Sequence, residues 1–167
     1  DLKYHAQLAV DPSFPIRVLP TFRPDRAMIL ANPESFHLWV DRLGEVSGVE
    51  VKDFSTLIEA LRKRHDYFHQ MGCRVSDHGI EQFYAEEAKE SELNQIFRDA
   101  YNGRTASANE RAKFKSAVLY ECAVMNFEKG WTQQFHVGAL RNNNTRMFRQ
   151  VGPDTGFDAI NDANMAR

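Results

Sequence analysis

The stretch 133–144 carries the side chains with the greatest capacity for chemistry in this chain. It contains a histidine, an arginine and three consecutive asparagines: His136, Arg141, Asn142, Asn143 and Asn144. An arginine binds a carboxylate through two parallel charge-assisted hydrogen bonds, and amides exchange hydrogen bonds with hydroxyls. A histidine binds a metal ion or transfers a proton near neutral pH. A packed core does not need so many polar groups together, so the pattern indicates a site for an acidic, polyhydroxylated molecule.

Two earlier polar clusters also follow predicted strands. The first contains Arg23 and Asp25, and the second contains Asp77 and His78. Because functional groups of a (β/α)₈ barrel lie on the loops after its strands, we expect both clusters to meet His136 in one site. His78 and His136 could bind a metal ion or relay protons; alternatively, either imidazole only bonds to the backbone or packs at the rim. Arg23 is expected to be held in place, with an exposed surface arginine as the alternative, and Asp77 to orient His78.

The hydrophobic pattern predicts three strands separated by helices. Strands are expected over residues 16–22, 73–79 and 131–137, with Pro20 at the carboxyl end of the first. Helices are expected over residues 2–10, 32–46, 53–72, 86–101 and 107–130, and three of them begin at the capping residues Asn32, Asp53 and Ser107. No periodic element is expected between residue 138 and about residue 159, and a helix start is expected near Asn164. This order predicts an α/β fold with parallel strands, as in part of a (β/α)₈ TIM-type barrel with helical connections.

The composition is that of an ordinary globular chain. Its 167 residues are enough for one domain, and 43% of them are hydrophobic and 26% charged. The net charge of −2 gives no electrostatic reason to expect nucleic acid or an anionic membrane as a partner. Cys73 and Cys122 form no disulfide framework, so a reducing cytoplasm is expected. His65 and His69 are interpreted as part of a basic last helical turn rather than as a metal-binding pair.

Four blocks of the sequence together resemble one enzyme family. The blocks cover residues 18–25, 72–78, 130–144 and 152–162, and include PTFRPD at 20–25 and CRVSDH at 73–78. In order and spacing they resemble uronate isomerase (glucuronate isomerase). The resemblance implies a metal-dependent barrel of the amidohydrolase type that interconverts D-glucuronate with D-fructuronate, and D-galacturonate with D-tagaturonate. It also implies proton transfer between C2 and C1, with a divalent metal ion, expected to be zinc, polarising the substrate oxygens.

The resemblance also implies roles for particular residues of this chain. His78 and His136 correspond to catalytic strand-end histidines at or near the metal ion, and either is a possible ligand. The expected substrate-binding residues are Arg23 for the sugar carboxylate, Asp25 beside it, and Arg141, Asn142 and Asn143, which line the site or shape its loop.

Two features of the family have no counterpart in this sequence. These are a His-x-His pair, and a late acidic metal ligand with a neighbouring arginine, so the main metal ligands are expected outside the chain. We therefore expect residues 1–167 to be one partial domain, about strand units 4 to 6 of eight, that is inactive alone. The expected partners of the parent enzyme are a uronate and further copies of itself. Two alternatives remain: a metal-dependent hydrolase on the same barrel type, and a non-catalytic sugar-acid-binding domain.

Overall fold

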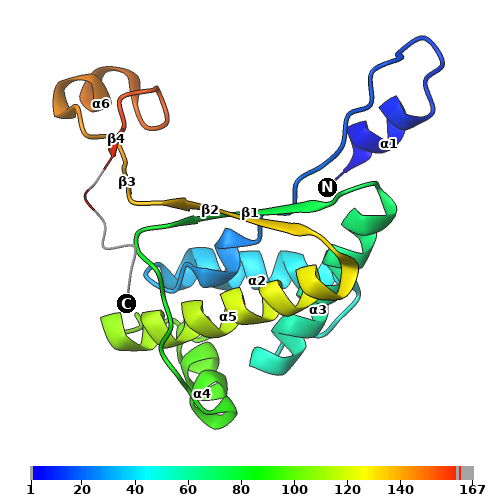
Figure 1. The fold of residues 1–167 in the computed structure, drawn as a ribbon. Helices are drawn as coiled ribbons and strands as arrows, with labels where there is room; N and C mark the ends of the chain where they lie inside the picture. The colour runs from blue at the N-terminus through cyan, green and yellow to red at the C-terminus, as the bar shows by residue number, and fades with distance from the viewer. Residues whose placement is uncertain (1, 161, 163–167) are drawn as a thin grey trace.

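A computed structural model of the protein describes residues 2–160 and residue 162. The fold is mixed α/β, as predicted, and is dominated by helices (Figure 1). In chain order the elements are α1 (Lys3–Ala9), the 3-10 turn η1 (Asp25–Met28), α2 (Pro33–Ser47), α3 (Phe54–Gln70), β1 (Val75–Ile80), α4 (Glu90–Tyr101), α5 (Ala108–Lys129), β2 (Thr132–Val137), β3 (Ala139–Leu140), α6 (Thr145–Val151) and β4 (Ala159–Ile160).

Strands β1 and β2 form a parallel pair whose register places Gly79 opposite His136. Helices α4 and α5 lie between them in the chain, which provides the long connection that parallel strands need. In Figure 1 the helices α2, α3, α4 and α5 gather on one side of the pair. Because the two strands run in the same direction, their carboxyl ends bring the polar residues of both to one edge.

The strand predicted over residues 16–22 is the main error of the sequence-based assignment. Only Phe22 pairs with β1, through an isolated parallel bridge to Ser76. Its amide donates to the Val75 carbonyl oxygen at 3.1 Å, and its carbonyl oxygen accepts from the Asp77 amide at 2.9 Å. Pro20 cannot donate a ladder hydrogen bond, which limits regular pairing before Phe22. The single bridge nevertheless places the following residues beside the end of β1.

The predicted helix starts of α2, α3 and α5 are confirmed. The Asn32 side chain accepts from the amide of Ser35, and Asp53 and Ser107 each form a capping box with the residue three positions later. Capping satisfies backbone amides that have no partner within the helix, and is worth about 1 kcal/mol at each start.

Helix α4 begins at Glu90, four residues later than the prediction of Glu86. The backbone amide of Glu86 instead donates to the hydroxyl of Ser116 on α5 at 2.8 Å. This contact ties the non-helical segment before α4 to the side of α5.

Edge-to-face aromatic contacts join the four helices under the strand pair. Phe114 of α5 meets Phe36 of α2 and Phe54 of α3, with ring centroids 6.3 and 5.3 Å apart. Phe36 also meets Phe97 of α4 at 5.7 Å. Such pairs add about 0.5–1.5 kcal/mol each beyond the burial of their surface. The strands therefore rest on a well-packed helical layer.

His65 lies in this core, so its interpretation as part of a basic turn is wrong. Its side chain is fully buried, its ring lies over Trp131, and its Nε2 is 3.0 Å from Asn126 Oδ1. Burial lowers the pKa of His65 to about 4, so the ring is uncharged at neutral pH. His69 accepts a hydrogen bond from the Trp131 indole at 2.9 Å.

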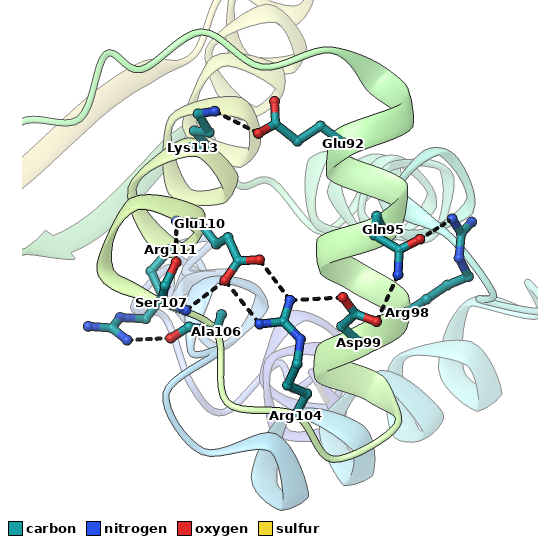
Figure 2. A network of polar contacts seen from close by, with 10 residues as sticks. All are labelled: Glu92, Gln95, Arg98, Asp99, Arg104, Ala106, Ser107, Glu110, Arg111 and Lys113. Atoms are coloured by element: carbon teal, nitrogen blue, oxygen red, sulfur yellow. Dashed lines mark hydrogen bonds and ion pairs between the residues drawn. The ribbon is translucent and has the colours of Figure 1, made fainter.

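An exposed ion network, here called the helix clasp, joins the end of α4 to the start of α5 (Figure 2). The Arg104 guanidinium lies between the carboxylates of Asp99 and Glu110, with nitrogen–oxygen distances of 2.7 to 3.1 Å. Glu110 also accepts from the backbone amide of Ser107 at 2.8 Å. The clasp therefore combines an ion-pair network with the capping box of α5.

Two smaller groups of elements stand away from the helical layer at opposite ends of the strand pair (Figure 1). One is α1, where a helix was predicted. The other contains β3, β4 and α6, where no periodic element was expected before about residue 159. Helix α6 is only 7 residues long and begins with the Asn144 side chain accepting from the Met147 amide. A helix that short has too few positions for a clear periodic pattern. A helix start expected near Asn164 lies outside the described residues.

Among the described residues, no helix is both long and apolar enough to cross a membrane.

Candidate active site

Asp77 holds an arginine and a histidine from two different segments at the edge of the strand pair. Its Oδ2 lies 3.3 Å from Arg23 Nη1, and its Oδ1 lies 2.6 Å from His136 Nδ1. The contact with His136 is short but does not have the geometry of an aligned hydrogen bond. Asp77 was expected to orient His78. It faces His136 instead, because adjacent residues of a strand point to opposite faces.

Asp25 forms a second carboxylate contact with the same guanidinium. Its Oδ2 accepts from Arg23 Nε at 2.9 Å and from the Gly79 amide at 2.9 Å. Burial opposes the ionisation of Asp25. The contacts from His78, the Gly79 amide and Arg23 outweigh burial, so the pKa of Asp25 lies below its usual value. Asp25 is therefore a carboxylate at neutral pH and holds Arg23 to the end of β1.

His78 lies next to Asp25 and is fully buried. Its Nδ1 is 3.6 Å from Asp25 Oδ1, and its Nε2 is 3.1 Å from the Ser76 hydroxyl. His78 therefore contacts the site through Asp25, whereas the His136 side chain is 54% exposed and reaches the solvent-accessible side.

Arg23 and His136 line one pocket of about 500 Å³. The other charged residues of its wall are Asp25, Glu81, Arg111, Lys115 and Arg141. Four basic side chains therefore face two acidic ones, and the Glu81 carboxylate is already paired with Lys115 Nζ at 2.7 Å. Arg23, Lys115 and Arg141 are each paired with a carboxylate, and Arg111 has no carboxylate partner in the described part of the chain. Arg111 therefore leaves a positive charge for an anionic ligand.

The expected substrate-binding residues after β2 divide into two groups. Arg141 lines the pocket, and its guanidinium is paired with Asp158 at 2.6 Å. Asn142 and Asn143 are not among the pocket-lining residues. Asn142 has a positive φ of 55° and donates its amide to Asp158, while the Asn143 amide donates to the Phe157 carbonyl oxygen. Their observed contacts shape the loop, which was one of the two roles expected for them.

Sequence reasoning missed Arg111 and Lys115. Both belong to α5, which was interpreted as a core helix. They are four positions apart and so lie on the same face of the helix. This spacing was the available signal, but it is also common on solvated helix surfaces, and only the fold shows that this face closes the pocket.

The residues of this chain do not by themselves fit a divalent metal site. Within the described ranges, no group of three or more His, Cys, Asp or Glu residues is arranged to hold an ion. Three buried atoms at the site lack hydrogen-bond partners: Asp25 Oδ1, Asp77 Oδ1 and His78 Nδ1. Two of them face each other and the third lies against His136, so they do not form the set of four converging ligands of a typical zinc site.

The glucuronate isomerase family matches the whole chain, residues 1–167. The chain belongs to this family. A uronate isomerase of Bacteroides thetaiotaomicron is 51% identical over 166 residues, which are 99% of this chain and 35% of that protein. A uronate isomerase of Cellvibrio japonicus is 48% identical and is matched by 100% of this chain and 36% of its own length. The chain thus spans about a third of the length of these curated relatives.

Solved structures of the glucuronate isomerase family share the fold described above. The uronate isomerase of Thermotoga maritima superposes with a TM-score of 0.88 and 28% identity, over 98% of this chain and 36% of that one. The glucuronate isomerase of Caulobacter crescentus gives a TM-score of 0.85 and 25% identity, over 99% and 34%. The parallel β1–β2 pair and its helical layer therefore correspond to a segment of these enzymes.

Proposed function

We propose that this chain works as part of a uronate isomerase that converts D-glucuronate to D-fructuronate and D-galacturonate to D-tagaturonate. In this reaction a proton leaves C2 of the open-chain aldose, an enediol forms, and a proton is delivered to C1. A hydroxyl proton moves from O2 to O1, so the overall composition is unchanged. The observation that carries the proposal is that the Asp77 carboxylate contacts both a guanidinium and an imidazole at the wall of one pocket.

Arg23 binds the sugar carboxylate in this proposal. Two of its nitrogens face Asp25 and Asp77, which fixes the plane of the guanidinium. Its Nη2 has no ion-pair or hydrogen-bond partner in the described part of the chain, and the Arg23 side chain lines the pocket. A guanidinium held in this way is pre-organised for a charge-assisted hydrogen bond to a carboxylate.

His136 moves the proton between C2 and C1. The side-chain amide nitrogen of Gln134 lies 3.1 Å from His136 Nε2. An amide nitrogen can only donate, so Nε2 carries a lone pair and the ring proton is on Nδ1, beside Asp77. The Gln134 side chain is exposed, and once it turns away Nε2 can accept the proton from C2. The Asp77 carboxylate then stabilises the imidazolium.

Lys115, Arg111 and Arg141 complete the recognition of the substrate. Lys115 Nζ is paired with Glu81, so the two present both a donor and an acceptor to a hydroxyl. Arg141 is paired with Asp158 and offers a further cation at the pocket wall. Asn142 and Asn143 support this loop in the proposal rather than contact the sugar.

Further features belong to the proposal. The chain forms part of a (β/α)₈ barrel, about strand units 4 to 6, which its parallel strand pair and helical crossover support. The barrel is of the amidohydrolase type, with a divalent metal ion, expected to be zinc, whose main ligands come from outside this chain. When bound, such an ion would polarise the substrate oxygens. In the proposal the enzyme works in the cytoplasm and associates with further copies of itself.

The test uses a protein of the length of the relatives. It is incubated with D-glucuronate and D-galacturonate, and the ketose products are followed by NMR. Formation of D-fructuronate or D-tagaturonate supports the proposal, and the 167-residue chain alone should give no turnover. Hydrolysis of amide or lactone substrates with no uronate turnover would point to a hydrolase. Calorimetric binding of uronates without turnover would indicate a sugar-acid-binding domain.

A further inference from the structure

A buried hydrogen-bond chain runs from the helical core to the back of the pocket. It begins at His65 on α3, passes through Asn126 on α5 and Ser76 on β1, and ends at His78, whose Nδ1 faces Asp25. The consecutive distances are 3.0 Å from His65 Nε2 to Asn126 Oδ1, 2.7 Å from Asn126 Nδ2 to Ser76 Oγ, and 3.1 Å from Ser76 Oγ to His78 Nε2. None of the four members of the chain is more than 2% exposed.

The direction of donation along this hydrogen-bond chain is fixed at His65. His65 Nδ1 is buried and has no hydrogen-bond partner. A buried N–H without an acceptor is rarer in proteins than an unused acceptor, so the proton of neutral His65 belongs on Nε2. Nε2 then donates to Asn126 Oδ1. Burial also keeps this ring neutral, since its pKa falls to about 4.

The orientation of the Asn126 amide follows from the hydrogen bond that His65 donates. With its oxygen accepting from His65, its amide nitrogen must point to Ser76 and to Gln133 Oε1, which lies 3.2 Å away. The amide nitrogen donates to the Ser76 hydroxyl oxygen, because it has no acceptor capacity. The Ser76 hydroxyl proton is then free to be donated, and His78 Nε2 is the acceptor within reach.

We propose that Asn126 and Ser76 are positioning residues that keep the proton of His78 on Nδ1. That N–H faces Asp25 Oδ1 at 3.6 Å, which is longer than a hydrogen bond. Neither atom has another partner among the described residues. The N–H faces the Asp25 carboxylate, whose other oxygen accepts a hydrogen bond from Arg23 Nε at 2.9 Å. The role of Asn126 and Ser76 is therefore indirect: they act on the Arg23 guanidinium through His78 and Asp25.

One consequence concerns the possible metal-ligand role of His78. With Nε2 accepting from Ser76 and Nδ1 carrying the proton, neither ring nitrogen has a lone pair left for an ion. In the proposed state His78 therefore supports the substrate-binding arginine and does not coordinate a metal. This inference rests on the proposed function only for its effect on substrate; the tautomer itself does not depend on it.

The decisive measurement is the tautomer of His78 in the wild-type protein of the relatives' length. Two-bond ¹H–¹⁵N correlation of histidine-labelled protein distinguishes a protonated from an unprotonated ring nitrogen, and the signals lost in His78→Gln identify His78. A protonated Nδ1 with an unprotonated Nε2 supports the proposal. The opposite tautomer, an averaged ring or a doubly protonated ring would overturn it.

Ser76→Ala tests the mechanism, with Gln133→Met as the matched control. Gln133 also accepts from Asn126, but it is not on the path to His78. Ser76→Ala should lower the Nδ1–H fraction of His78 and raise KM for D-glucuronate by about 3- to 10-fold, with kcat within about twofold, which corresponds to a loss of about 1 kcal/mol in binding. Ser76→Thr, which retains the hydroxyl, should restore both values.

The outcomes separate the two proposals. If Ser76→Ala leaves the His78 tautomer as in the wild type, or if Gln133→Met changes it equally, the positioning role is wrong. If the protein turns over no uronate but the tautomer is as expected, the proposed function fails and the hydrogen-bond chain stands. Thermal unfolding of each variant shows whether it is folded. If Ser76→Ala does not fold, the tautomer of His78 in the wild type still tests the positioning role.

Discussion

The helix clasp and the pocket contain similar ion networks that differ in how completely they are satisfied. Each centres on one arginine between two carboxylates, and the two arginine side chains are almost equally exposed, 45% for Arg104 and 48% for Arg23. In the clasp, Arg104 makes contacts of 2.7 to 3.1 Å to Asp99 and Glu110. In the pocket, Arg23 reaches Asp77 only at 3.3 Å and leaves Nη2 without a partner in the described residues.

The carboxylates show the same contrast. Glu110 is used by Arg104 and by the backbone amide of Ser107. Asp25 and Asp77 each retain a buried oxygen that has no hydrogen-bond partner. Buried polar atoms are nearly always paired, so unpaired ones in a cleft mark a place where a ligand or a moving proton completes the set. Incomplete pairing, rather than charge density, therefore separates the candidate active site from a structural contact.

The largest expected effect of a substitution follows from the role of His136. His136→Gln removes the only group in the pocket proposed to move the proton, and should lower kcat for D-glucuronate by about 10²- to 10⁴-fold. The side chain is more than half exposed, so the unfolding temperature should stay close to that of the wild type. Steady-state kinetics and thermal unfolding check both values. A kcat within threefold of the wild type would show that another group transfers the proton.

Arg23→Met should chiefly weaken recognition of the sugar carboxylate. A lost charge-assisted hydrogen bond costs about 1.5–3 kcal/mol, so KM should rise about 10- to 150-fold while kcat changes less. Arg17→Met is the matched control, because Arg17 is exposed and is not part of the pocket wall. The proposed role of Arg23 is wrong if its variant keeps the wild-type kcat/KM, or if Arg17→Met is affected equally.

The helices and the polar strand ends could be predicted from the sequence, but the partners of the side chains in the site could not. Capping residues such as Asp53 and Ser107 act on their own helix, so local patterns located the helices of the layer. The polar ends of the strands located Arg23 and His136, because strand direction alone brings such residues to one edge.

Tertiary packing decided the rest of the site. Asp77 was assigned to its sequence neighbour His78 but contacts Arg23 and His136 in space. Lys115 joins the pocket only because α5 packs against the strand pair. A short β-branched run ending at Phe22 resembled a strand, yet it pairs at one residue. Local patterns cannot show which of several possible neighbours a side chain will meet.

Gly79→Ala tests how closely the pocket constrains Arg23. An added Cβ would lie 2.7 Å from Arg23 Nη2 and 3.3 Å from Asp25 Oδ2. The arginine end is flexible and can move away, so stability should change little. The displaced guanidinium should lose about 1 kcal/mol of substrate binding, which is about a fivefold rise in KM.

A double-mutant cycle provides the control for Gly79→Ala. In the Arg23→Met background, the added methyl group should have no further effect on KM, because the group that it displaces is gone. Additive effects of the two substitutions would mean that Gly79 acts on the site through something other than Arg23.

The smallest expected effect belongs to the helix clasp and should appear in acid. The side-chain contact with Arg104 is the largest cause that lowers the pKa of Glu110, to about 2 from the usual 4.5. Because the folded pKa is below the unfolded one, the stabilisation is present above pH 4.5 and is lost as the pH falls toward 2. The network is solvent-screened, so the change should be no more than about 1 kcal/mol. Glu110→Gln should be less stable than the wild type at pH 7, and chemical denaturation across this range should show the two converging at low pH. A difference in stability that persists unchanged at pH 2, or a change in KM at pH 7, would contradict the separation of the clasp from the pocket.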